Sequence, residues 1–111
     1  MRIFDVTVDN KGELKSSPDK MRVPRGTSEN FAVALAEGTE SDYALLPLHF
    51  EENPRGAATQ QRLNPSVILI RDNNEREVGA GQKDEIVKFS IRVRARGGTK
   101  ELFLDPVIVN E

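Results

Sequence analysis

The sequence predicts an all-β fold, a two-sheet antiparallel β-sandwich. Two observations lead to it: apolar and polar residues alternate with a period of two in most segments, and short turn signals separate those segments. About seven or eight short strands in a chain of this length are typical of a sandwich, because each sheet has one apolar face that a partner sheet hides from water. We therefore expect a single domain over residues 1–111.

The N-terminal segment predicts a half-buried strand. Phe4 and Val6 alternate with polar residues, and the turn residues at 10–12 end the alternation. A second short strand is expected around Met21 and Val23, before the turn that contains Pro24 and Gly26.

The next segment allows two interpretations. Phe31, Val33 and Leu35 alternate with alanines, and alanine favours helix. We predict a strand, because the apolar residues follow a period of two and glycines stand close on both sides. The alanines would then form a smooth outward row, suited either to covering by arginine stems of a neighbouring strand or to self-association. They are Ala32, Ala34 and Ala36.

The middle of the chain predicts two strands and a long loop. Residues 43–50 are apolar on both faces, which suits a central strand, but Pro47 favours an edge or a bulge. Residues 51–64 are polar without a clear period, and such a connection is usually mobile or functional. Residues 67–70 predict a strand buried on both faces, and residues 72–75 a hairpin turn.

The clearest strand is predicted over residues 85–96, after a flexible junction at 79–81. Apolar side chains face one way along it and mostly basic side chains face the other. Residues 97–99 turn the chain, and residues 102–109 are expected to return antiparallel to it.

Two stretches resemble a known family. One is residues 23–27 (Val-Pro-Arg-Gly-Thr) with the alternating strand that follows, and the other is the final hairpin, which closes with Asp105-Pro106 and ends at Asn110. They are similar to the small bacterial cupredoxin-like β-sandwiches, which often end in a strand with Asp-Pro and a terminal Ile/Val-x-Asn. The resemblance implies a Greek-key sandwich, and an immunoglobulin-like topology would give nearly the same pattern.

Copper-binding members of that family hold the metal with two histidines, one cysteine and usually a methionine. Most of these ligands come from the loop before the last strand, which here is residues 97–99 (Gly-Gly-Thr). The sequence has no cysteine, and His49 is its only histidine. Because a blue copper site needs soft ligands, the resemblance implies a metal-free relative without electron transfer, and we expect no cofactor.

Other catalytic arrangements find little support. No Gly-x-Ser-x-Gly elbow frames a nucleophile for His49, which we interpret as a strand histidine at a sheet edge. Residues 72–75 are dense in the hard oxygen ligands that calcium prefers, but an EF-hand loop would need glycine where Glu77 stands. We interpret this segment as a solvated hairpin and expect no enzyme activity.

The composition bounds the partners. Net charge is −2, which argues against a general polyanion binder. No apolar run approaches the roughly 20 residues that span a bilayer, and the N-terminus is too acidic for a signal peptide. We expect a cytoplasmic protein without a membrane partner, although a leader that is cleaved off would leave the same sequence.

The basic row on the predicted strand 85–96 is the sharpest chemical feature. Its side chains would lie about 6.6–6.8 Å apart, close to the spacing of phosphates along a nucleic acid. The chain has few aromatic residues for base stacking, so we interpret the cations as pairing with neighbouring carboxylates or recognising a protein partner.

We therefore predict a protein-interaction or self-association module. Its candidate surface combines the basic row with the polar segment 51–64: Lys88, Arg92, Arg94, Arg96, Arg55, Gln60 and Gln61. Two competing hypotheses remain: a domain that binds or hydrolyses a carbohydrate or small polar ligand, and a domain that binds nucleic acid through the basic strand.

Overall fold

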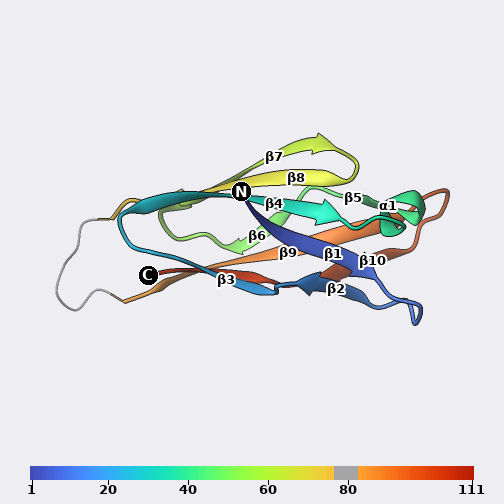
Figure 1. Ribbon diagram of the computed structural model, residues 1–111, viewed down its shortest axis with the longest axis horizontal. Helices are drawn as coiled ribbons and strands as arrows, with labels where there is room; N and C mark the ends of the chain where they lie inside the picture. Colours follow the sequence, from blue (N-terminus) through green and yellow to red (C-terminus); the bar gives the residue numbers. More distant parts are fainter. Residues whose placement is uncertain (77–82) are drawn as a thin grey trace.

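The computed structural model describes residues 1–76 and 83–111, and it confirms an all-β sandwich of two sheets (Figure 1). The first sheet has five strands in the order β2-β1-β4-β8-β7. Their bounds are Leu14–Ser17 (β2), Arg2–Val8 (β1), Thr27–Leu35 (β4), Val67–Asn74 (β8) and Ala58–Asn64 (β7).

The second sheet is built around the longest strand, β9 (Glu85–Ala95). The returning chain pairs β10 and then β11 with successive parts of β9, and β3 pairs with β11. Two further short strands, β5 and β6, also pair with β9. The bounds are Glu101–Leu104 (β10), Val107–Asn110 (β11), Lys20–Val23 (β3), Tyr43–Leu45 (β5) and His49–Glu52 (β6).

Two short helical segments lie in the connections. The four-residue helix α1 (Thr39–Asp42) precedes β5, and the 3-10 turn η1 (Pro54–Gly56) precedes β7. Within residues 1–76 and 83–111, no helix is long and apolar enough to cross a membrane.

The strand pairing is mixed, whereas the sequence predicted antiparallel sheets. β1 pairs in parallel with β4, and β11 pairs in parallel with β3. A parallel pair needs a crossover connection, and the chain makes the one from β1 to β4 through β3, which belongs to the opposite sheet. Alternation along a strand carries no information about its direction beside a neighbour, so the parallel pairs were not predicted.

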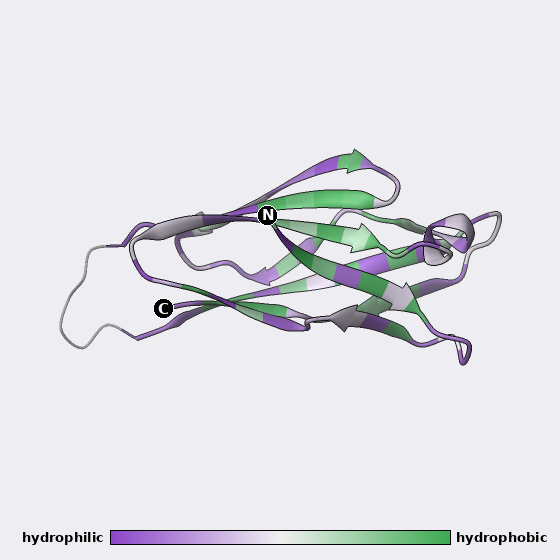
Figure 2. Cartoon of the chain, in the orientation of Figure 1, coloured by the Kyte–Doolittle hydropathy of each residue, from purple (hydrophilic) through white to green (hydrophobic). Residues whose placement is uncertain are grey.

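The core lies between the two sheets and is supplied by the alternating strands. Phe4, Phe31 and Phe89 are completely buried, and the ring of Phe4 contacts both other rings at centroid distances of 5.7 and 5.5 Å. Fully burying one such side chain stabilises a fold by about 1.5–3 kcal/mol. In Figure 2 the hydrophobic residues concentrate on the strands, while the connecting loops are mostly hydrophilic.

Several predicted strands are confirmed. Residues 27–35 form a strand rather than a helix, with Phe31, Val33 and Leu35 buried. The long strand predicted over 85–96 is β9, and its apolar side chains face the core. The returning segment forms β10 and β11, with a break at Asp105-Pro106.

Two predictions for the middle of the chain are wrong in whole or in part. Residues 43–50 are not one central strand, but the edge position predicted from Pro47 is confirmed: β5 and β6 are short, separated around Pro47, and pair only with β9 among the described residues. Residues 51–64, predicted as a polar loop, instead contain the end of β6, η1 and β7. Because residues 59–64 of β7 are all exposed, no burial period marks this edge strand in the sequence.

The predicted hairpin turn at 72–75 is also wrong. β8 continues to Asn74, and its burial alternates, so the strand is not buried on both faces. Asp72 and Asn74 are completely buried on the same side as Ile68 and Ile70. The predicted junction at 79–81 lies outside the described residues.

Candidate interaction surface

The four cations of the basic row, three in β9 and Arg96 directly after it, are exposed or half-buried, whereas Ser90 of the same row is buried. Each of these cations has a partner within the chain. Lys88 Nζ lies 3.7 Å from a Glu52 carboxylate oxygen, and Arg94 Nη2 lies 3.3 Å from one of Glu101. The other two arginines donate to backbone carbonyls. Arg92 Nη2 donates to Pro47 O (2.9 Å), and Arg96 Nε donates to Glu40 O (2.9 Å).

This arrangement limits what the basic row offers a partner. The two exposed ion pairs contribute only about 0–1 kcal/mol each, whereas Arg92 and Arg96 are held by hydrogen bonds to backbone carbonyls. The guanidinium groups of Arg92 and Arg96 form hydrogen bonds with the backbone on either side of β5 and so fix the segments that flank it.

The polar segment 51–64 contributes residues to three different places. Arg55, in the left-handed region with φ 60°, places Nε 2.6 Å from Glu85 Oε1. Gln60 accepts a hydrogen bond from Leu48 N (2.8 Å) and donates one to Leu48 O (2.7 Å). Gln61 is exposed, pairs in register with Leu69, and lies on the opposite face of β7 from Gln60.

The structure therefore does not bring the seven predicted residues together. The basic row faces outward from the β9 sheet, whereas Gln61 faces outward from the other sheet, on the far side of the sandwich. The Gln60 side chain points toward the connection between β5 and β6, where it forms hydrogen bonds with the backbone N–H and C=O of Leu48.

His49 is exposed on the edge strand β6. Among residues 1–76 and 83–111, no three histidine or carboxylate side chains are grouped closely enough to hold a metal ion.

The outward face of the five-stranded sheet has an apolar centre. In register across three neighbouring strands lie Ile3, Ala32 and Leu69, and Gln61 follows on β7. Ile3 is 50% exposed although it is a large aliphatic residue in a strand. The row on one side of this centre holds Ala34.

We call this surface the β4 face, because β4 runs through its middle. It consists of Ile3, Asp5, Ala32, Ala34, Val67, Leu69, Arg71 and Gln61. Of the alanine row predicted from the sequence, Ala32 and Ala34 lie here, between β1 and β8 and not beside the basic strand, while Ala36 follows the end of β4. Large aliphatic groups outside a core are notable only when they are contiguous, as they are on this face.

Two opposite charges flank the apolar centre at diagonal positions. Asp5 lies one row beyond it on β1, in register with Ala34, and Arg71 lies one row beyond it in the other direction on β8, in register with Asn30. Strand and residue spacings put the two Cα atoms about 17 Å apart. Both side chains are exposed, and neither forms an ion pair with any residue in the described part of the chain.

A shallow depression of about 390 Å³ lies at the Arg71 end of the β4 face. Leu69 and the polar side chains of Asn30, Thr59, Gln61 and Arg71 are among its lining residues. Gln61 belonged to the surface predicted from the sequence, but the β4 face as a whole was not predicted. Two features of the sequence could have indicated this face: Ile3, an aliphatic residue at an outward position of its strand, and the outward alanines of the strand that pairs with it.

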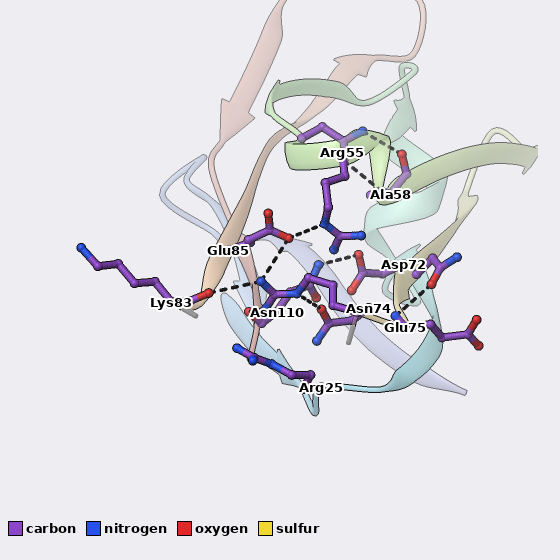
Figure 3. A network of polar contacts seen from close by, with 12 residues as sticks. Arg25, Arg55, Ala58, Asp72, Asn74, Glu75, Lys83, Glu85 and Asn110 are labelled. Carbon is purple, nitrogen blue, oxygen red and sulfur yellow. Dashed lines mark hydrogen bonds and ion pairs between the residues drawn. The ribbon is translucent and has the colours of Figure 1, made fainter. Parts of the chain in front are cut away.

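A polar network, drawn in Figure 3, is buried near the C-terminus, at the end of the molecule opposite to the loop 97–99 (Figure 1). Asn74 Nδ2 lies 3.0 Å from both Val23 O and Glu111 O, so β8 is tied to β3 and to the end of β11. Arg76, whose side chain is 11% exposed, donates to Asn110 O and Glu111 O at 2.9 and 2.8 Å. This network binds the two sheets together with hydrogen bonds where apolar packing ends.

No protein-family model matches the chain, and no similar sequence is found among curated proteins.

Proposed function

We propose that this chain is a protein-interaction module that self-associates weakly through the β4 face. The observation that supports it is the contiguous apolar centre of that face, Ile3, Ala32 and Leu69, between the opposite charges of Asp5 and Arg71. The partner is a second copy of the same chain, for a reason of charge.

The charges of the β4 face complement each other under two-fold symmetry. Asp5 and Arg71 lie on opposite sides of the apolar centre, too far apart to pair within one chain. Two copies can pack face to face about a two-fold axis that lies between them, perpendicular to the line from Asp5 to Arg71. Each Asp5 then meets the Arg71 of the other copy. A two-fold interface uses the same patch twice, so one intramolecular diagonal creates two intermolecular ion pairs.

The size of the face sets the strength of the association. The apolar centre and its two charges cover roughly 20 × 20 Å, or about 400 Å² on each copy. The total is below the range of stable interfaces. We therefore expect a dissociation constant on the order of 0.1 mM, and a monomer at low micromolar concentration.

Charge reversal tests the proposal directly. Asp5→Arg and Arg71→Asp should each weaken dimerisation at least tenfold in sedimentation equilibrium, because like charges then meet at both rims. The double variant should dimerise again, since the arginine introduced at position 5 would meet the aspartate introduced at position 71 of the other copy. Self-association that survives both single variants, or that the double variant fails to restore, would overturn the proposal.

The basic row supplies the matched control. Arg92→Glu with Arg94→Glu reverses charge on the opposite side of the sandwich. Dimerisation should be unchanged, whereas a loss would move the interface to the basic row.

A small polar ligand is the second candidate, and the depression beside Arg71 favours it. Its volume of about 390 Å³ lies in the range of small-molecule sites. The guanidinium of Arg71 and the amides of Asn30 and Gln61 would suit a ligand with a carboxylate and hydroxyl groups. A thermal-shift panel of sugar acids separates the two functions, since bound ligand stabilises the fold and competes with dimerisation.

Nucleic-acid binding through Lys88, Arg92, Arg94 and Arg96 is less well supported, because all four cations have partners within the chain. A gel shift at low salt would detect it, with an affinity that falls steeply as salt is added.

A further inference from the structure

The buried polar network contains a carboxyl group between the two sheets. Asp72 belongs to β8 in the five-stranded sheet, and Asn110 belongs to β11 in the other sheet. Both residues are completely buried, and Asn110 Nδ2 donates to Asp72 Oδ1 at 2.9 Å. Figure 3 shows them with Asn74, close to Arg55 and Glu85.

The two groups leave a matched pair of atoms without partners. Asp72 Oδ2 and Asn110 Oδ1 are buried, and neither has a hydrogen-bond partner among the described residues. An ionised carboxylate and an amide oxygen are both acceptors only. One hydrogen atom between the two groups would satisfy both oxygens.

We propose that Asp72 carries a proton in the folded protein and that it closes a two-bond ring with the Asn110 amide across the two sheets. In this ring the Asp72 hydroxyl, on Oδ2, donates to Asn110 Oδ1, while Asn110 Nδ2 donates to Asp72 Oδ1. The site is thus a proton-binding clasp, and the proton is its ligand.

Among the described residues, none of the salt bridges involves the Asp72 carboxyl, and the nearby arginines pair with Glu85. Arg55 approaches from η1, but its Nε is 2.6 Å from Glu85 Oε1, and Arg76 also lies 3.5 Å from that oxygen. Asp72 is in register with Glu29 of β4 on one side and with Ala58 of β7 on the other. Ala58 carries no charge. Arg55 and Arg76 therefore pair with the Glu85 carboxylate and not with Asp72.

The pKa of Asp72 agrees with this assignment. Burial raises the pKa of the carboxyl above its ordinary value, the Asn110 hydrogen bond and the charge of Arg55 oppose the rise, and Glu85 adds to it. A carboxyl with a raised pKa in the folded state stabilises the fold at low pH. That contribution is lost as pH rises through the folded-state pKa. Each unit by which folding raises the pKa then corresponds to a tenfold loss in the folding equilibrium constant. Ionisation then leaves acceptors facing each other and loosens the clasp.

Carbon-13 NMR of the Asp72 carboxyl carbon, followed from pH 3 to pH 8, tests the proposal on the unmodified protein. We expect its titration midpoint above 3.8, the ordinary value for an aspartate side chain. A carboxyl ionised throughout this range, with a buried water donating to both oxygens, would overturn it.

The variant Asp72→Asn gives a second measurement, because an amide can form the same two-bond ring without a titrating proton. As pH rises above 3.8, the free energy of unfolding should fall less in this variant than in the parent, because the variant has no Asp72 proton to lose. An unchanged decline contradicts the clasp, and if the variant fails to fold, the NMR titration still decides.

Asp9→Asn is the matched control. Hydrogen bonds from the backbone of Glu13 and Lys11 and the nearby Lys15 lower the pKa of Asp9, although burial opposes them. Its contribution to stability is lost as pH falls, so this variant should change the profile with the opposite sign.

Discussion

Gln60 illustrates how one polar side chain can replace a stretch of strand pairing. Pro47 and Leu48 lie between β5 and β6 and belong to neither strand. The Gln60 amide meets both the N–H and the C=O of Leu48 there, at 2.8 and 2.7 Å. Leu48 is buried, so these backbone groups have little access to water.

Replacing Gln60 with leucine should therefore destabilise the fold. Both Leu48 groups would lose their partner, and an unsatisfied buried polar group costs about 1–3 kcal/mol. We expect the free energy of unfolding in urea to fall by about 2 kcal/mol, within that range.

Gln61→Leu is the control for this substitution at low micromolar concentration, where the chain is expected to be monomeric, because this neighbouring side chain is exposed and makes no hydrogen bond with the described residues. It should change the stability by less than about 0.5 kcal/mol, as surface substitutions usually do. Equal losses from both variants would show that strand propensity, and not the Leu48 contact, determines the effect.

At the scale of elements, burial decided which predictions succeeded. β4 and β9 each bury one face, so alternation revealed them correctly. β7 exposes nearly every residue, and an edge strand of that kind has no burial period to detect. The sequence therefore predicted a loop where the structure has a strand.

The prediction for the end of β8 was wrong for a different reason. Asp72 and Asn74 occupy core-facing positions in register with the alternation of Ile68 and Ile70. Asp and Asn commonly mark turns, so local residue preference outweighed the period. Only the hydrogen bonds from distant segments, above all Asn110 from β11, make these positions compatible with burial.

β9 joins the second sheet and also contributes its central aromatic ring. Phe89 is completely buried, contacts Phe4 of the opposite sheet at a centroid distance of 5.5 Å, and lies 6.2 Å from the Phe50 ring. Phe89→Ala should reduce the free energy of unfolding by about 3–5 kcal/mol, because it removes buried area and leaves a cavity between the sheets.

Chemical denaturation measures this loss, and Phe103→Ala is the appropriate control. Phe103 is 71% exposed on β10, so its removal should cost little. A small effect at Phe89 would mean that the sheets are held mainly by the polar network and not by this ring.

At the scale of the whole molecule, the two outer faces of the sandwich differ in character. The β9 sheet presents cations that are already paired or bonded to carbonyls, whereas the β4 face presents aliphatic groups flanked by Asp5 and Arg71, which form no ion pair with the described residues. The basic row was predicted because charge is visible in a sequence. The β4 face was not, because its residues come from four strands that only the fold brings together.

Salt should separate the two contributions to the proposed dimer. The Asp5–Arg71 pairs would lie at exposed rims, where screening at a Debye length of about 10 Å at 0.1 M salt is effective. The apolar contact does not depend on screening. We therefore expect dimerisation, followed by sedimentation equilibrium, to weaken several-fold between about 0.02 and 0.5 M sodium chloride without disappearing.

A variant with neutral rims isolates the apolar contribution to this salt dependence. In the Asp5→Asn, Arg71→Gln double variant, the same increase in salt should leave dimerisation nearly unchanged, because no rim charge remains to be screened. Association that strengthens with salt in the parent chain, or the same salt dependence in both proteins, would show that the rim charges do not select the partner.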